Sequence, residues 1–396
     1  MKKLTILAVA LMMSVAAMAQ QALWGGAAVV SPEVHPDNSV TFRYNAPKAR
    51  TVQVVGDFIP GDNGGTVAMT QNDKGVWEYT TEPLASELYS YSFIVDGVRG
   101  VSDPSNVYQI RDVASVTNYF VIGGGQGDLY LNKDVPHGSI HKDWYYCSQE
   151  GFNRRVTVYT PAAYDGKKRF PVLYLLHGIG GDEEAWMDLG RASQILDNLI
   201  ASGKAEPMIV VMTNGNISQQ AAPGYGPEGF VVPSMGLPKT MEGSFEAAFP
   251  EVVKFIDGKY RTIAKKSSRA IAGLSMGGFH SMQISKEYPD MFDYVGLFSA
   301  ALSVGGQQAG SPIYENVDQK VDTQFAKGLK LYWIACGNTD FLYQNNQNFK
   351  NALKAMSYGH TYMEAPGDHE WPYWDKAIQY AIRFFLRMDL NETILY

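Results

Sequence analysis

Before residue 123 the chain alternates apolar and polar residues in short runs that are separated by turn residues. In residues 88–95, Leu88 and every second residue after it share one face, while Tyr89 and every second residue after it share the other. Asp96-Gly97 follows directly, a pair typical of tight hairpin turns. Strands of this length and spacing predict an all-β sandwich of about immunoglobulin-like size. The expected strands are residues 39–44, 51–55, 75–80, 88–95 and 115–122.

Beyond residue 130 the pattern changes, because apolar runs of strand length alternate with longer segments of helical periodicity. This alternation predicts an α/β fold in which helices cover both faces of a doubly wound, mostly parallel sheet. Strands are expected at residues 155–160, 170–176, 208–213, 269–274, 293–298, 329–336 and 360–365, and helices at 183–202, 245–260, 279–288, 345–357 and 374–386.

The two parts are joined by a flexible segment, and the chain begins with an export signal. Residues 123–127 read Gly-Gly-Gly-Gln-Gly, a linker composition. Residues 1–19 have a basic start, a short apolar middle and an Ala-Met-Ala end, which is typical of a cleavable secretory signal. The predicted organisation is a signal peptide (1–19), a β-sandwich module (20–122), a Gly-rich linker (123–130) and an α/β domain (131–396). We expect an exported protein, periplasmic or extracellular, without a membrane anchor after signal removal.

One short motif in the α/β part indicates nucleophilic chemistry. Gly273-Leu-Ser-Met-Gly277 follows a run of strand character and precedes a helical segment. In the α/β-hydrolase fold this context places the serine on a sharp, strained turn between strand and helix. The two glycines fit such a turn because strand and helix pass too close there for a Cβ atom. Ser275 is therefore the predicted nucleophile, and the α/β domain is predicted to be an α/β hydrolase.

A serine hydroxyl is a weak nucleophile, so it needs a base, and the base needs an orienting acid. His369 lies in the loop after the last expected strand, where this fold carries its base. Asp340 lies in the loop after the preceding strand and is the predicted acid. Asp368 is a competitor, but neighbouring side chains diverge, which places it poorly for supporting His369. The order Ser275, Asp340, His369 is the chain order of this fold.

Acyl transfer also requires N–H donors for the oxyanion that develops on the substrate. The backbone N–H of Met276, directly after the nucleophile, is one predicted donor. Residues 177–181, His-Gly-Ile-Gly-Gly, follow an apolar strand and supply the second, the N–H of Ile179. His177, at the start of this oxyanion loop, is expected to have a structural role.

Charge and cysteine content limit the partners and cofactors. The net charge is −7, and it becomes −9 without Lys2 and Lys3 of the signal, so nucleic acid would be repelled. Neutral carbohydrate is electrostatically compatible. Cys147 and Cys336 have no metal-binding spacing, and either one disulfide or two buried thiols fits the sequence. We predict neither a metal nor a cofactor, and the sequence gives no oligomeric state.

Two regions are candidates for substrate contact. Residues 214–244 are rich in glycine, proline and polar residues and lack periodicity, and loops of this length in compact domains are usually functional. An aromatic side chain also stands beside His369, where packing of the loop is an equally good explanation. The candidate substrate-binding residues are Tyr225, Phe230, Met235 and Trp371.

These motifs carry a family resemblance. Residues 175–182 and 272–279, together with the loops that hold Asp340 and His369, resemble the esterase D family, and most of all its carbohydrate esterases, which include feruloyl and acetyl xylan esterases. The resemblance covers residues 130–396. The β module resembles the glycogen-binding-like sandwich that often precedes such esterases. The resemblance implies hydrolysis of esters that link ferulic or acetic acid to plant cell-wall polysaccharide such as arabinoxylan, or to feruloylated oligosaccharides. It leaves open whether the β module binds sugar or acts as a spacer.

Three other functions remain open. Siderophore trilactone esterases also pair a β module with this type of hydrolase, but several of them act inside the cell, which the export signal disfavours. A cytosolic thioester hydrolase of the same family is disfavoured by the signal and by the β module. A carbohydrate-binding protein with an idle hydrolase fold is disfavoured by the intact set Ser275, Asp340 and His369.

Overall fold

The computed structural model describes residues 29–61, 64–113, 115–227, 236–302 and 310–384. The chain divides into two compact units, residues 1–84 with 91–107 and residues 85–90 with 108–396. The predicted signal peptide lies outside the described residues, and the predicted domain boundaries at 122 and 131 stay predictions. No helix within the described ranges combines the length and the apolar character that crossing a bilayer requires.

The first unit contains an antiparallel sandwich, as the alternating pattern predicts. One sheet has the order β1-β2-β6-β5. The other has the order β4-β3-β7-β10-β9, and β8 also pairs with β7. The boundary between the two units falls inside β7, so β9 and β10 of this sheet belong to the second unit. The two sheets are held together by aromatic rings, such as Phe42 of β2 and Tyr91 of β7, whose centroids are 4.8 Å apart. Asp96 and Gly97 both have positive φ, 48° and 87°, as the predicted hairpin turn requires. The strands are β1 (Glu33–Val34), β2 (Val40–Asn45), β3 (Val52–Gly56), β4 (Gly65–Ala68), β5 (Thr70–Gln71), β6 (Val76–Thr80), β7 (Leu88–Val95) and β8 (Val98–Val101).

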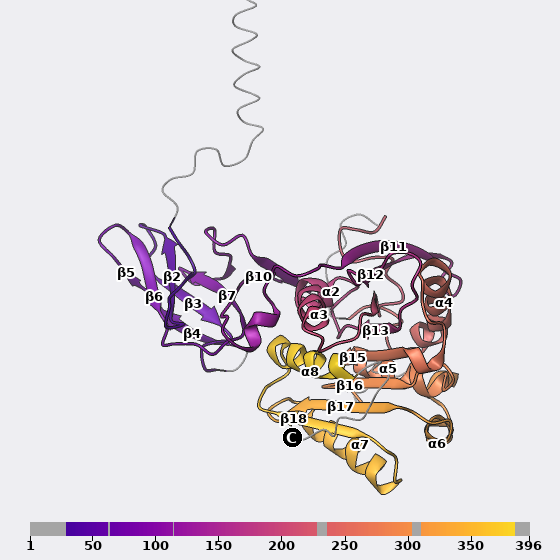
Figure 1. The fold of residues 1–396 in the computed structure, drawn as a ribbon. Helices are drawn as coiled ribbons and strands as arrows, with labels where there is room; N and C mark the ends of the chain where they lie inside the picture. Colours follow the sequence, from indigo (N-terminus) through magenta and orange to yellow (C-terminus); the bar gives the residue numbers. More distant parts are fainter. Residues whose placement is uncertain (1–28, 62–63, 114, 228–235, 303–309, 385–396) are drawn as a thin grey trace, which may run out of the picture. The chain divides into compact units, whose positions relative to one another are not determined.

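The second unit is built on an eight-stranded sheet of order β11-β12-β14-β13-β15-β16-β17-β18 (Figure 1). Strands β13 to β18 pair in parallel, and β11 and β12 add two antiparallel strands at one edge. The predicted doubly wound, mostly parallel sheet is confirmed. Its strands are β11 (Ser139–Cys147), β12 (Phe152–Thr160), β13 (Val172–Leu176), β14 (Ile209–Thr213), β15 (Arg269–Leu274), β16 (Tyr294–Phe298), β17 (Leu331–Gly337) and β18 (Thr361–Ala365); a hairpin of β9 (Gln109–Asp112) and β10 (Ser115–Val121) precedes them.

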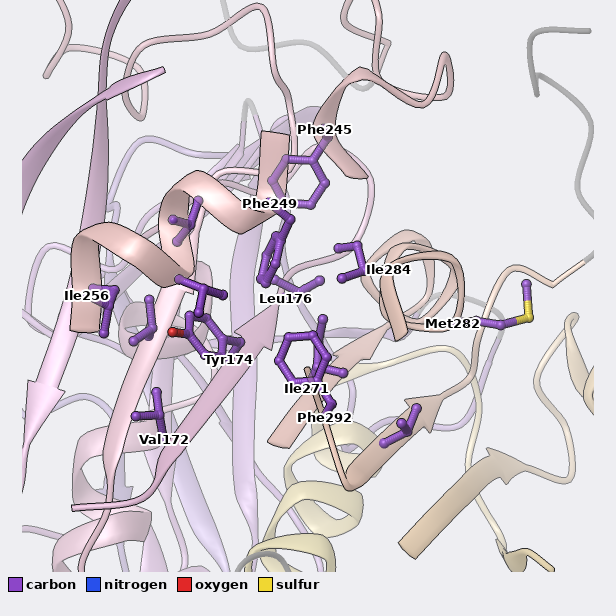
Figure 2. Close-up of a cluster of buried hydrophobic side chains, with 14 of the residues drawn as sticks. Val172, Tyr174, Leu176, Phe245, Phe249, Ile256, Ile271, Met282, Ile284 and Phe292 are labelled. Carbon is purple, nitrogen blue, oxygen red and sulfur yellow. The ribbon is translucent and has the colours of Figure 1, made fainter. Parts of the chain in front are cut away.

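Two hydrophobic cores lie on the two faces of this sheet. Strand β13 alternates between them, since Leu173 and Leu175 enter one core while Tyr174 and Leu176 enter the other. Figure 2 shows the second core, where Phe249 of α4 lies close to Tyr174. Helices α2 (Ala185–Asp188), α3 (Ala192–Ala201) and α8 (Trp371–Phe384) pack on the first face, and α4 (Ser244–Lys259), α5 (Met276–Glu287), α6 (Val317–Ala326) and α7 (Tyr343–Ala355) on the second.

Some elements differ from the expectation. Strand β11 was not predicted, because it lies at the sheet edge and four alternate side chains of its outer face, such as Trp144, remain exposed instead of forming an apolar run. Helix α6 was not predicted either, since it buries little apolar surface. The single helix expected at residues 183–202 is two helices, because Arg191 adopts a left-handed conformation with φ 45°. Cys147 and Cys336 are both buried free thiols.

Candidate active site

Ser275 lies on the turn between β15 and α5 with φ 52° and ψ −115°. A positive φ is uncommon for a residue with a Cβ atom and stores strain in the backbone. Gly277 permits the turn, because a Cβ atom at that position would lie 2.4 Å from the carbonyl oxygen of Leu176 in β13. The strained turn that the motif predicts is therefore present, and the role of Ser275 as nucleophile stays a prediction.

His369 and Asp340 are brought together by two loops that touch. Asp340 follows β17, His369 follows β18, and a Cβ atom on Gly337 would lie 2.1 Å from the carbonyl oxygen of Gly367. The Nδ1 atom of His369 lies 2.9 Å from Oδ2 of Asp340. Since a carboxylate only accepts, Nδ1–H donates and Nε2 is left for another partner. Asp368 instead accepts the backbone N–H of His369 at 2.8 Å.

The Asp340 carboxyl group is buried but held in its charged form. Burial raises its pKa, but the hydrogen bonds donated by His369 and by the backbone N–H of Leu342, the latter 2.8 Å long, outweigh this effect. The pKa of Asp340 therefore lies below its ordinary value, and the group is a carboxylate at neutral pH. Such a charge fixes the tautomer of the imidazole and stabilises it when it becomes protonated.

One predicted oxyanion donor, Met276, directly follows Ser275 in the chain, and the other, Ile179, lines the same cavity. Met276 is the first residue of α5, where backbone N–H groups lack partners within the helix. In the oxyanion loop, the carbonyl oxygen of Gly178 accepts Nδ1–H of His177 at 2.6 Å and the N–H of Gly181 at 3.1 Å. The C=O and N–H of a trans peptide point in opposite directions. These two bonds therefore fix the direction of the Ile179 N–H.

His177 uses both ring nitrogens inside the fold. Its Nε2 atom accepts the backbone N–H of Gly215, two residues after β14, at 2.8 Å. Burial lowers the pKa of His177 to about 4, so the ring is neutral and Nδ1 carries its proton. The expected structural role of His177 is therefore to connect the oxyanion loop to the loop after β14 through two hydrogen bonds.

Ser275 and His369 line one cavity of about 220 Å³ within the second unit. Its surface is largely apolar, which suits an acyl group, and it includes Ile179, Leu189, Leu274 and Trp374. Each other histidine is engaged elsewhere. The bonded pairs are His35 with Thr41, His137 with Asp197, His141 with Thr160, His280 with Glu246 and His360 with the carbonyl of Tyr358.

Of the predicted substrate-contact residues, only Tyr225 has a described side chain. Its ring stacks at 4.1 Å on the Arg155 guanidinium group, and most of its surface is exposed. Phe230 and Met235 lie outside the described residues. Trp371 starts α8, but its side chain is also outside the description. All four substrate contacts stay predictions; the described lining of the cavity does not include Tyr225.

Sequence reasoning indicates residues 371–374 as a stretch that could shape the pocket, but it does not single out Trp374 and it misses Phe341. The Trp374 ring meets the imidazole edge to face, with centroids 4.7 Å apart, and the exposed Phe341 ring lies 4.5 Å from it. Trp374 stands three positions after Trp371, on the same helix face, so the helical period was an available signal. Asp112 and Val113 also line the cavity, and no local pattern indicates this.

Comparisons with known proteins agree with this fold and with the geometry around Ser275. The described second unit has the fold of an α/β hydrolase. Residues 149–385 match the family model "Putative esterase", and residues 26–110 match "Carbohydrate-binding module 48 (Isoamylase N-terminal domain)". The chain belongs to this esterase family, whose reaction is the hydrolysis of carboxylic esters. The predicted family and the predicted type of β module are confirmed.

Individual relatives cover different parts of the chain. An "Endo-1,4-beta-xylanase/feruloyl esterase" of Xylanibacter ruminicola is 32% identical over 88% of this chain, which spans 45% of that protein's length. A solved structure titled "ferulic acid esterase" is 27% identical, with a TM-score of 0.53 over 63% of this chain and 98% of its own. The enterobactin esterase FES of Shigella flexneri is 17% identical, with a TM-score of 0.61 over 87% of this chain and 92% of its own, a likeness of fold alone.

Proposed function

We propose that the protein is an exported serine carboxylesterase that removes feruloyl groups, and to a lesser extent acetyl groups, from plant cell-wall polysaccharide such as arabinoxylan. The observation that carries the proposal is that three segments far apart in the sequence meet at one place. A serine on a strained turn and a histidine that is hydrogen-bonded to a buried carboxylate line one apolar cavity.

The mechanism follows from the hydrogen bonds. With Nδ1–H of His369 bound to Asp340, Nε2 is the atom that takes the proton of Ser275 as its oxygen attacks the ester carbonyl. The N–H groups of Ile179 and Met276 stabilise the oxyanion. His369 then gives this proton to the alcohol oxygen as the ester C–O bond breaks, which leaves the acyl group on Ser275. Water, deprotonated by Nε2, attacks this acyl-enzyme. Nε2 returns the proton to the Ser275 oxygen as the acid is released.

The substrate class rests on the relatives. The Xylanibacter protein is named as a xylanase and feruloyl esterase, and the solved relative with 27% identity as a ferulic acid esterase. The match of residues 26–110 to a carbohydrate-binding module supports a polysaccharide as the alcohol side of the ester. The apolar lining of the cavity supports an aromatic acyl group as the acid side.

One comparison of substrates tests this proposal. Purified protein is incubated in parallel with methyl ferulate, acetylated xylan and a catecholate trilactone, and the same series is repeated with Ser275→Ala. We expect rapid release of ferulate, slower release of acetate, and loss of both in the variant. Release from the trilactone alone would replace the plant cell-wall assignment by the siderophore hypothesis. Equal activity of the variant would remove Ser275 from the mechanism.

Export is tested separately. We expect the chain expressed with residues 1–19 in a Gram-negative host to be recovered from the periplasm or the medium with Gln20 as its first residue, as read by mass spectrometry. Recovery from the cytoplasm with residues 1–19 still attached would contradict the export part of the proposal and leave the esterase part standing.

A further inference from the structure

The hairpin formed by β9 and β10 contributes two residues to the wall of the cavity that holds Ser275. Asp112 and Ser115 pair across this hairpin, and Asp112 and Val113 line the cavity. The hairpin belongs to the second unit, although it precedes the Gly-rich segment of residues 123–127 in the sequence. It therefore adds to the cavity two residues that come from outside the eight-stranded sheet and the helices that cover it.

Val113 is held in an unfavourable backbone conformation. Its φ is 52°, a value that is a clear outlier for a β-branched residue. Tight hairpin turns with positive φ normally use Asn, Asp or Gly, as Asp96-Gly97 does in this same chain. Strain of this kind persists where the surrounding structure enforces it, and it concentrates at functional sites. A valine in such a conformation, at a position that lines the cavity, indicates that the side chain is needed there.

A second observation ties the turn to the oxyanion loop. The guanidinium group of Arg111 forms an ion pair with Asp182, whose side chain is 2% exposed and which directly follows the oxyanion loop. Arg111 also donates from Nη1 to the carbonyl oxygen of Val113 at 3.3 Å. Asp182 in turn accepts the backbone N–H of Glu184 at 3.0 Å. One arginine thus holds both the strained turn and the end of the loop that presents Ile179.

We propose that Val113 and Asp112 form the selective wall of the acyl pocket, for an acyl group that carries an aromatic ring and a phenolic hydroxyl. This inference rests on the proposed function. Val113 extends the apolar surface made by Leu189 and Trp374 and packs on the ring. Asp112 lines the same cavity, and a carboxylate can accept a hydrogen bond from the phenolic O–H.

The test compares acyl groups that differ by one feature. Methyl ferulate, methyl 3-methoxycinnamate (the cinnamate ester), which lacks only the phenolic hydroxyl, and methyl acetate are assayed with wild type, Val113→Gly and Asp112→Ala. We expect Val113→Gly to lower the kcat/KM ratio of cinnamate to acetate by about tenfold, the effect of one lost apolar contact. We expect Asp112→Ala to lower the ratio of ferulate to cinnamate by roughly tenfold, the effect of one lost hydrogen bond to a charged group.

A matched variant and a stability measurement separate selectivity from folding. Val116, which is exposed on β10 of the same hairpin, provides the control Val116→Gly, for which both ratios should stay at the wild-type value. Because glycine relieves the strain at position 113, Val113→Gly should unfold at a temperature no lower than wild type. Unchanged ratios in Val113→Gly and Asp112→Ala, or equal changes in Val116→Gly, would overturn the inference.

Failure of the proposed function gives a different result. If wild type hydrolyses neither ferulate nor cinnamate, the substrate assignment fails, and 4-nitrophenyl esters from acetate to hexanoate replace them. Val113→Gly should then still shift the preference along this series, because the wall is part of the pocket whichever acyl group it accepts. A preference unchanged along the series would show that the turn does not shape the pocket.

Discussion

His177 offers a sharp test of how the oxyanion loop is built, because its two hydrogen bonds can be removed one at a time. An asparagine side chain is short and places its amide N–H near the position of Nδ1, whereas a glutamine side chain places its carbonyl oxygen near the position of Nε2. His177→Asn should therefore keep the bond to the Gly178 carbonyl and lose the bond from the Gly215 N–H. His177→Gln should do the reverse.

The two losses have different consequences. In His177→Asn, the buried N–H of Gly215 is left without its partner, which costs about 1–3 kcal/mol of stability. In His177→Gln, the Gly178–Ile179 peptide keeps only its bond from the Gly181 N–H, so the direction of the Ile179 N–H is less fixed. Complete loss of one oxyanion donor reduces kcat by about 10²–10³. We expect a loss of roughly 10-fold to 100-fold in kcat for the glutamine variant, with little change in KM.

The assay measures kcat and KM on methyl ferulate together with the midpoint of urea unfolding. We expect a crossed pattern, in which asparagine lowers stability more than activity and glutamine lowers activity more than stability. His137→Gln is a suitable control, because the His137 side chain is half exposed and bonded to Asp197, away from the cavity. Equal losses of kcat in the two His177 variants would refute the link between the Gly178 carbonyl and the Ile179 N–H.

Further predictions concern titration, the acid and the thiols. Burial lowers the pKa of His177 from 6.5, the value expected in the unfolded chain, to about 4. As the pH falls, the unfolded chain therefore binds a proton at His177 before the folded protein does. The free energy of unfolding is unaffected by this histidine above pH 6.5 and decreases by roughly 3 kcal/mol as the pH falls to 4. The urea midpoint of wild type should fall more steeply over that range than that of His177→Asn. Asp340→Asn should reduce kcat on methyl ferulate by about 10⁴, because the wrong imidazole tautomer is stabilised, whereas Asp368→Asn should change it by less than about tenfold. Cys147 and Cys336 are buried, and burial raises the pKa of Cys336 to about 12, so neither thiol should react with a thiol reagent at pH 8 until the protein unfolds.

The sequence predicts those parts of the fold whose signals are local. Strand β15 and the turn at Ser275 are legible because an apolar run, two glycines and a helical period follow one another within a few residues. Asp340 and His369 could be chosen because each stands in a loop after an expected strand, of which β17 is apolar and buried throughout. The topology of parallel sheets gathers such loops at one edge. Nothing local distinguishes β11, whose outer face remains in solvent at the sheet edge.

The cavity wall lay beyond sequence reasoning for a different reason. A hydrophobic pattern reports that a side chain is buried, but not which distant segment it meets. Tyr225 stood in a long loop of functional composition, yet its ring stacks on Arg155, whose charge is in turn bound by Glu183 and Glu184. Asp112 carried no comparable signal, since it stands at the end of a short strand in a part of the chain that reads as a separate module.

The ion pair of Arg111 and Asp182 gives this wall a physical connection to catalysis. A carboxylate that is 2% exposed is costly to bury without a cation, so the fold of the oxyanion loop and the placement of the hairpin are energetically linked. Displacing the hairpin leaves Asp182 unpaired next to Gly181, at the end of the segment that orients the Ile179 N–H. A change in the hairpin that weakens this pair should therefore reduce kcat for every acyl group, whereas a change confined to the Val113 side chain should alter only the choice among them. These two signatures separate support of the oxyanion loop from selection of the substrate.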